Sequence, residues 1–483
     1  MVLTLFLSVI IIYFLVLLGV AYYTSRNANN ETFFIGNKSS HWALVAFGMI
    51  GTSLSGVTFV SVPGTVELAK FSYFQVVIGY FLGYFVVAFV LLPLYYKLQL
   101  TSIYNYLGQR FGIASYKTGA LFFIISRTLG ATLRLYLVIN VLQLFVLDKL
   151  NVPFEVTTLI ILILILLYTF KGGVKTIVWT DTLQTFFMLL ALVVCVFYIM
   201  GDLNLSLSET IAKLDASGHM QIFNWNFDDK KFFLKQIIGG AFITIAMTGL
   251  DQEMMQKNIS VKTLGGAQKN MVLFSSVMVL VNFLFLLLGG VLYLFAESKG
   301  LTVKGDDLFP TIALSHLPVA ISLIFIIGLI SALFPSADGA ITALTSSFCI
   351  DIMGFQRKKN WTEAMQSRTR KTVHLTFAVL FLVMVYYFKI LNNKSIISIL
   401  LDVAGYTYGP LLGLFAFGIL TKHRIKDEYA PIVCLVAPTL CYFFQNNVPA
   451  YFGWNYQIGI ELLLINGALT FLGLWFIKKR ELK

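Results

Sequence analysis

Charged residues are scarce in this sequence. Asp, Glu, Lys and Arg make up 12% of its 483 residues, whereas hydrophobic residues make up 58%. A water-soluble protein of this length needs far more charge to cover its surface. Cysteine and histidine are also rare, with four and five copies, and they form no C-x-x-C or H-E-x-x-H arrangement. The sequence therefore argues against a disulfide framework, a catalytic metal site and an enzyme.

Long apolar runs dominate instead, at residues 3–22, 71–95 and 272–295 among others. Each approaches or exceeds the roughly 20 residues that cross a ~30 Å hydrocarbon layer. The first run is too long for a signal-peptide core and lacks an A-x-A-like cleavage site, so we expect it to be retained. We predict an all-α polytopic membrane protein with about thirteen transmembrane helices, near residues 3–23, 42–66, 71–95, 118–147, 152–170, 176–201, 233–253, 270–296, 313–350, 372–390, 395–420, 429–446 and 456–477.

The distribution of lysine and arginine predicts the orientation. With the N-terminus outside, most of the 35 basic residues fall in inside segments. They cluster before the tenth predicted span and at the C-terminal tail, as Arg357, Lys358, Lys359, Arg368, Arg370, Lys371, Lys478, Lys479, Arg480 and Lys483. By the positive-inside rule the C-terminus is then cytoplasmic. We expect a bacterial inner-membrane protein, and topology rather than nucleic-acid binding accounts for the net charge of +12.

Two predicted spans are interrupted by small and hydroxyl residues. Residues 47–58 read FGMIGTSLSGVT, and the seventh span carries Gly239-Gly240 and then TGLDQ at 248–252. Irregular backbone at membrane depth survives only where it lines a cavity or is buried in protein. Interrupted spans in corresponding positions of two halves indicate an inverted-repeat transporter with its binding site at the breaks. Glycine that merely permits close helix packing is the alternative.

Ionisable residues within the predicted spans are the second functional signal. Each costs a few kcal/mol at the bilayer centre on insertion scales, so such residues mark sites or pair with one another. The candidates are Arg127, Arg134, Asp181, Asp338 and Asp402. A structural salt bridge is the alternative for any one of them.

Several segments, taken in order and spacing, resemble the sodium:solute symporter family. They are FFIGN at 33–37, TSIYNYLGQRFG at 101–112, GGVKT at 172–176, TDTLQ at 180–184, DQ at 251–252 and CIDI at 349–352. The resemblance covers residues 31–422 and implies an amino-acid/sodium-symporter type fold with a five-plus-five inverted repeat. It implies a first span and cytoplasmic linker (1–41), two five-helix repeats (42–201 and 233–422) joined by an extracytoplasmic loop (202–232), and two accessory spans with a basic tail (423–483).

The resemblance also implies a sodium site between the breaks of spans two and nine. Its ligands would be the carbonyls of Gly51, Leu54 and Ala332 and the hydroxyl of Ser336. A hard monovalent cation favours such oxygen ligands, which replace its hydration shell. The family pattern has a hydroxyl residue before Ser336, where this chain has Pro335. We expect two further residues, Asp181 and Asp338, to supply negative charge to one or two sodium ions.

For the solute, the sequence departs from sugar-importing branches of the family, since Val57-Thr58, Met247 and Met278 replace their polar residues. The branch that imports sialic acid looks closer. Its binding residues match Ser53, Ser55, Thr58, Phe71, Gln75 and Arg134. An arginine fork binds a carboxylate through two hydrogen bonds, and Arg127, seven residues earlier on nearly the same helix face, is the competing anchor.

We therefore expect a sodium-coupled secondary active symporter that imports a small polar solute, such as the organic anion sialic acid, by alternating access. Symport of another carboxylate, an amino acid or a sugar, with sodium or protons, remains the alternative. A membrane sensor is the alternative outside transport. The expected partners are the solute, sodium ions and the lipid bilayer, and the sequence leaves the oligomeric state open.

Overall fold

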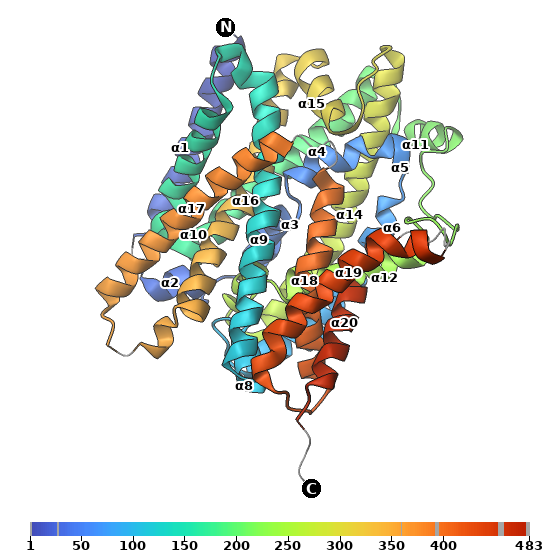
Figure 1. Cartoon of the computed structure of the whole chain (residues 1–483). Coiled ribbons are helices and arrows are strands. Elements are labelled where there is room, and N and C mark those ends of the chain that lie inside the picture. The colour runs from blue at the N-terminus through green and yellow to red at the C-terminus, as the bar shows by residue number, and fades with distance from the viewer. Residues whose placement is uncertain (1, 27–28, 359, 392–395, 453–457, 480–483) are drawn as a thin grey trace.

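The computed structural model describes residues 2–26, 29–358, 360–391, 396–452 and 458–479, and these form a bundle of long helices (Figure 1). The helices are α1 Val2–Thr24, α2 Asn30–Ile35, α3 Trp42–Ser53, α4 Gly56–Gly64, α5 Val66–Ala69, α6 Tyr73–Val86, α7 Leu92–Lys97, α8 Asn105–Arg110, α9 Ile113–Leu142, α10 Phe154–Asp202, α11 Leu207–Ala216, α12 Phe233–Thr244, α13 Gln252–Ile259, α14 Leu264–Ser298, α15 Leu308–Thr311, α16 Val319–Ser347, α17 Glu363–Leu391, α18 Ile396–Leu420, α19 Ala430–Phe452 and α20 Leu462–Phe476. Lys359, Arg480, Lys483 and the start of the last predicted span lie outside the described residues.

Eight helices in the described ranges are long and apolar enough to cross a membrane, or up to ten if each bent pair counts as one span. Two shorter apolar helical segments, Phe154–Phe170 and Leu462–Phe476, add to these. Each predicted span overlaps a helix or a bent pair. The predicted extracytoplasmic loop also contains a helix, α11, which a capping box of Ser206 and Glu209 starts.

The predicted break in the second span separates α3 from α4. Helix α3 ends at Ser53, Leu54 adopts φ −84° and ψ 78°, and Ser55 is extended with ψ 174° before α4 begins at Gly56. The two helices are bent by 53°. The last carbonyls of α3 therefore lose their usual donors from the next turn. All the residues around this break except Ser53 are buried, so the free backbone lies inside the protein.

A second break lies between α12 and α13. Helix α12 passes into a π-helical turn, Ile245–Gly249, and the chain then bends by 64°. The side chain of Asp251 starts α13 by accepting hydrogen bonds from the backbone N–H groups of Glu253 (2.9 Å) and Met254 (3.2 Å). Small and polar residues at 248–252 thus end one helix and begin the next.

Gly239-Gly240 does not form a break. These glycines instead allow close helix packing, the alternative considered for the sequence. A Cβ atom at Gly240 would lie 2.4 Å from the carbonyl oxygen of Val76 on α6. A Cβ atom at Gly79 would likewise lie 2.2 Å from the carbonyl oxygen of Ile237 on α12. The backbones of α6 and α12 are therefore in direct contact, as small residues permit in membrane helices.

Helix α10 contains a sharp bend that separates two predicted spans. Gly173 has φ 53° and ψ −138°, a conformation that residues with side chains rarely adopt. Beyond this bend, α10 packs against α3 and α16, while α9 packs against α16 and α18. These helices surround the two breaks and position the candidate site.

Candidate binding cavity and buried charge network

A polar cavity lies beside the break between α3 and α4. Its empty volume, counted together with the space open to solvent, is about 820 Å³. Helices α3, α4, α6, α9, α12, α14 and α18 contribute to its wall. The lining residues are Thr52, Ser53, Leu54, Ser55, Val57, Thr58, Tyr73, Tyr80, Tyr84, Arg127, Arg134, Ile243, Thr244, Met247, Thr248, Met254, Met278, Asn282, Leu400 and Leu401.

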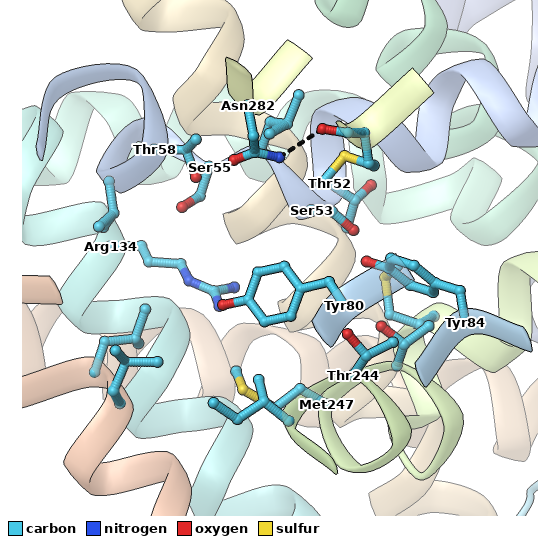
Figure 2. A pocket seen from close by; sticks show the side chains of 18 of the residues that line it. Thr52, Ser53, Ser55, Thr58, Tyr80, Tyr84, Arg134, Thr244, Met247 and Asn282 are labelled. Atoms are coloured by element: carbon cyan, nitrogen blue, oxygen red, sulfur yellow. Dashed lines mark hydrogen bonds between the residues drawn. The ribbon is translucent and has the colours of Figure 1, made fainter. Parts of the chain in front are cut away.

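Four of the predicted substrate residues, Ser53, Ser55, Thr58 and Arg134, line this cavity. Figure 2 shows Arg134 reaching from α9 toward the phenol end of Tyr80, with Ser55 and Thr58 on the side of the helix break. The arrangement combines hydroxyl groups on one wall with a guanidinium on another. It is chemically suited to a ligand that carries both hydroxyls and a negative charge.

The other two predicted substrate residues do not line the cavity. Phe71 is fully buried and packs edge-on against Phe283. The amide of Gln75 donates to the carbonyls of Ser72 (3.0 Å) and Lys231 (3.3 Å) and accepts from the backbone N–H of Asn224 (3.2 Å). Gln75 therefore holds the segment between α11 and α12 in place, because backbone groups of that segment satisfy its amide.

The two arginines of α9 have different surroundings. Arg127 pairs with Glu253 and lies 3.9 Å from Asp251. Arg134 has no ion pair with any described carboxylate, its Nε has no hydrogen-bond partner there, and its side chain is 9% exposed. The alternative of a salt bridge from Arg134 to a buried aspartate is thus not found among the described residues. Arg134 is the arginine whose guanidinium is available to a ligand.

Seven polar residues of the cavity were not predicted from the sequence, namely Thr52, Tyr73, Tyr80, Tyr84, Thr244, Thr248 and Asn282. Tyr73, Tyr80 and Tyr84 face it from α6, and Asn282 faces it from α14, where its Nδ2 donates to the carbonyl of Met278 at 2.8 Å (Figure 2). The tyrosines are seven and four residues apart, a spacing that places them on one helix face. That periodicity was the available signal in an otherwise apolar helix.

The residues of the predicted sodium site lie on helices that touch. Helix α16 packs against both α3 and α4. Gly51 belongs to the last turn of α3, and Leu54 lies in the break itself. Ser336 donates its hydroxyl hydrogen to the carbonyl of Leu333 at 2.9 Å, which leaves the oxygen lone pairs as acceptors. Pro335 has no N–H, so the carbonyl one turn earlier in α16, at Ser331, also lacks its intrahelical donor.

Asp181 is held by a lysine that the sequence analysis did not consider. The Lys257 ammonium on α13 lies 2.6 Å from Asp181 Oδ2 and 2.6 Å from Thr52 Oγ1. Thr52 in turn donates to Asp181 Oδ2 at 3.0 Å. Lys257 also lies 3.5 Å from Glu253, which connects this group to Arg127. The carboxylate that we expected to supply negative charge to sodium is thus paired with a lysine of the protein in this structure.

Asp338 has a different partner. Its Oδ2 accepts a hydrogen bond from the hydroxyl of Tyr168 at 2.7 Å, and Asp338 is fully buried. No described lysine or arginine lies within ion-pair distance of it. Asp402 is exposed and lies outside this group. Of the two aspartates predicted to attract sodium, Asp338 is thus the one whose charge has no cation partner in the described part of the chain.

A family comparison agrees with this architecture. The model of the sodium:solute symporter family matches residues 33–428, which is most of the chain. The chain belongs to the sodium:solute symporter family. It is therefore an integral membrane protein that couples solute transport to sodium, and it is not an enzyme.

Individual relatives resemble this symporter over nearly its full length. The sodium/sialic acid symporter NanT of Aliivibrio fischeri is 22% identical over 467 residues, which cover 94% of this chain and 89% of NanT. The sodium-coupled monocarboxylate transporter 1 of Mus musculus is 26% identical, covering 83% of this chain and 66% of its own. A solved Na⁺-coupled sialic acid symporter in a substrate-bound outward-open state has a TM-score of 0.84 at 19% identity, with 98% of both chains covered. This likeness confirms the predicted fold class.

Two methionines distinguish the symporter's cavity from the sugar-type pattern. Met247 and Met278 both line it, at the positions where the resemblance placed a tyrosine and a lysine in sugar-importing branches. They contribute flexible apolar surface and only weak acceptors. Apart from Thr244 and Thr248 beside Met247, the polar groups of the cavity lie at the helix break, on α6, on α9 and at Asn282.

Proposed function

We propose that the symporter imports a small solute that carries a carboxylate, and that sialic acid is such a solute. The observation that carries this proposal is Arg134, a buried cation that faces a polar cavity and has no described carboxylate partner. A charge held within a membrane protein costs several kcal/mol unless it is compensated. A bound carboxylate compensates it and matches the guanidinium with two parallel hydrogen bonds.

The opposite wall fits the remainder of such a solute. Ser53, Ser55 and Thr58 present hydroxyls that donate to and accept from a polyol or an amide. Tyr80 and Tyr84 add an aromatic face and two further hydroxyls. The similarity to sodium/sialic acid symporters, and the polyol and carboxylate of sialic acid itself, support this assignment.

Sodium enters this proposal as the driving ion. We assign it to the carbonyls of Gly51, Leu54 and Ala332 and the hydroxyl of Ser336. Because α3 ends beside the cavity, an ion bound to its last carbonyls stabilises the same break that presents Ser53 and Ser55. Binding of the ion and of the solute is coupled through this shared backbone. Import further requires the predicted orientation, with the N-terminus outside.

Uptake into proteoliposomes tests the proposal. We expect labelled N-acetylneuraminic acid to accumulate with an inward sodium gradient and not with choline. Arg134→Ala is expected to weaken apparent affinity at least about 30-fold, since loss of one partner of a desolvated charge pair costs about 2–5 kcal/mol. Arg134→Lys keeps the positive charge but cannot form two parallel hydrogen bonds with a carboxylate. Its apparent affinity is therefore expected to lie between those of the wild type and Arg134→Ala.

Met278→Leu is the matched control, because it changes the same cavity while conserving volume and polarity. It is expected to transport at close to the wild-type rate. Wild-type affinity in Arg134→Ala would refute the carboxylate anchor. No uptake of sialic acid in either salt would refute that substrate, and the same assay would then be run with amino acids, sugar acids and monocarboxylates.

A smaller monocarboxylate is the second candidate. The similarity to sodium-coupled monocarboxylate transporters favours it, as do Met247 and Met278, which line the cavity with apolar surface. The two candidates differ in their need for hydroxyl groups. Ser55→Ala is expected to impair uptake of sialic acid but to leave a short monocarboxylate largely unaffected, because only the larger solute reaches from Arg134 to the break.

A further inference from the structure

Lys257 lies at the junction of four helices that enclose the proposed sodium site. It belongs to α13, and its ammonium reaches α10 at Asp181 and the last turn of α3 at Thr52. A Cβ atom added to Gly339 on α16 would lie 3.3 Å from its Nζ. The ammonium thus contacts α3 at Thr52 and lies beside Gly339 of α16, the residue after Asp338.

Oxygen atoms form the polar surroundings of this ammonium. It bonds the Asp181 carboxylate and the Thr52 hydroxyl at 2.6 Å each, and a carboxylate oxygen of Glu253 lies at 3.5 Å. A carboxylate and a hydroxyl with a second carboxylate nearby are also the ligand types that a hard monovalent cation favours. Lys257 therefore fills a place whose chemistry is that of a sodium site.

Lys257, Thr52 and Asp181 are all buried, so the ammonium charge of Lys257 is what compensates the carboxylate of Asp181. Lys257 is 3% exposed, Thr52 1% and Asp181 0%, so bulk water does not compensate these charges. Within the described chain, Asp181 Oδ1 has no hydrogen-bond partner, so the carboxylate depends on Lys257 and Thr52. Removal of one partner from a buried ion pair leaves the other charge uncompensated. A mobile cation would then be drawn to the vacated position.

We propose that the Lys257 ammonium permanently occupies a second cation position, formed by Asp181, Thr52 and Glu253, so that the symporter carries one sodium ion per cycle. The proposal rests on the sodium coupling proposed above and specifies its stoichiometry. Asp181 is neutralised by a charge that belongs to the protein and is not transported. The single transported ion binds between the α3 break and α16, on the side of Asp338.

Equilibrium binding of ²²Na⁺ to the purified protein tests this without any solute. We expect one bound ion per wild-type chain and two in Lys257→Met, where the second ion replaces the ammonium on Asp181. The thermal midpoint of Lys257→Met is expected to depend more steeply on sodium than that of the wild type, because the ion restores the lost charge. The double variant Lys257→Met/Asp181→Asn removes both charges and is expected to return to one ion.

Two results would overturn the proposal. The first is two ions bound to the wild type, and the second is a folded Lys257→Met that binds one ion and gains no sodium dependence. Lys257→Ala, purified in sodium so that the ion compensates Asp181 from the start, serves as a second variant if Lys257→Met does not fold. A folded Lys257→Ala that binds only one ion would equally overturn the proposal.

The binding experiment, taken together with the uptake assay above, separates this inference from the proposed function. Loss of ²²Na⁺ binding from the wild type and all variants would refute sodium coupling itself. Normal ion counts without uptake of sialic acid would refute only that substrate. One ion in the wild type and two in Lys257→Met support the proposal that the Lys257 ammonium acts as a tethered cation in the second position, whatever the solute.

Discussion

Arg127 and Arg134 lie about two turns apart on α9 and line the same cavity, but their charges are compensated differently. Glu253 and Asp251 surround Arg127, whereas Arg134 meets no described carboxylate. A cation within the bilayer costs about 2.5–3.5 kcal/mol even on the mildest scales. Arg127 is therefore compensated within the fold, whereas Arg134 is the arginine for which we propose a bound carboxylate. The different compensation of the two charges was not available from the sequence, where both arginines lie on nearly the same helix face.

Gly339 allows the buried charges to approach α16, and its substitution tests how tightly they pack. A Cβ atom there would lie 2.3 Å from Glu253 Oε1 and 3.3 Å from Lys257 Nζ. We expect Gly339→Ala to displace both side chains and to destabilise the protein by about 1–3 kcal/mol, as overpacking does. A lower thermal midpoint in detergent and slower sodium-driven uptake are the expected readouts.

Gly265→Ala is the matched control for this substitution. It lies in α14, and no atom lies within 4 Å of its added Cβ. Alanine favours a helix over glycine by about 1 kcal/mol, so the midpoint is expected to stay or rise. If Gly339→Ala behaved like Gly265→Ala, the contact of α16 with the charge network would not be essential.

At the scale of helices, the two breaks were predictable and the contacts between helices were not. Residues 47–58 and 248–252 combine small and hydroxyl residues in apolar spans, which locally weakens a helix, and both segments break. Gly239-Gly240 has a similar composition but packs α12 against α6. Composition thus marks irregular or tightly packed backbone, and only the neighbouring helix decides which of the two forms.

The charge network was unpredictable for the same reason. Lys257 is 76 residues from Asp181 and 205 from Thr52 in the chain. Their pairing depends on how α13 turns after the second break, which local sequence does not set. Gln75 illustrates the converse, since its place on α6 fits the resemblance but its amide bonds the segment before α12.

The short helical turn Gly305–Asp307 contacts the end of α4 and gives the fold a pH dependence. A Cβ atom at Gly64 would lie 2.2 Å from the Gly305 carbonyl oxygen. Burial raises the pKa of Asp306 from 3.8 to about 6. The folded protein therefore binds more protons than the unfolded chain between these values, and this contribution to stability falls as pH rises through that window.

We expect the thermal midpoint of the wild type to drop between about pH 4 and pH 6 more steeply than that of Asp306→Asn, which cannot ionise. Differential scanning fluorimetry across this range measures the difference. Asp307→Asn, at the exposed neighbouring position, is expected to keep most of the drop, because burial contributes more than the Asp307 charge to the raised pKa of Asp306. If the thermal midpoints of the wild type and Asp306→Asn changed in parallel with pH, protonation of Asp306 would not contribute to stability.

For the whole molecule, a tethered cation changes what drives transport. A tenfold sodium gradient provides about 1.4 kcal/mol, and 100 mV adds about 2.3 kcal/mol for each net charge moved. One sodium ion with one monoanion moves no net charge, so accumulation stays near tenfold and does not depend on voltage. A second ion would raise the total to about 5 kcal/mol. The symporter is therefore expected to favour electroneutral uptake over steep accumulation.

Alternating access can be followed with a single reporter thiol. All four native cysteines are buried in the described structure, so the background reaction with an aqueous maleimide is expected to be slow. Ser53 lines the cavity at the break and is only half-buried, which makes Ser53→Cys a suitable reporter. Cysteine is only slightly larger than serine, so the substitution changes the volume of this side chain little.

In right-side-out vesicles we expect a membrane-impermeant maleimide to label Ser53→Cys faster in sodium than in choline. Symport loads the ion and the solute from the same side, so sodium must favour the conformation open to that side, and an ion shifts populations only by its difference in affinity for the two states. Saturating substrate is expected to slow the labelling by covering the thiol. Equal rates in sodium and choline would mean that the ion does not control access to the cavity, and coupling would then have to arise through solute affinity alone.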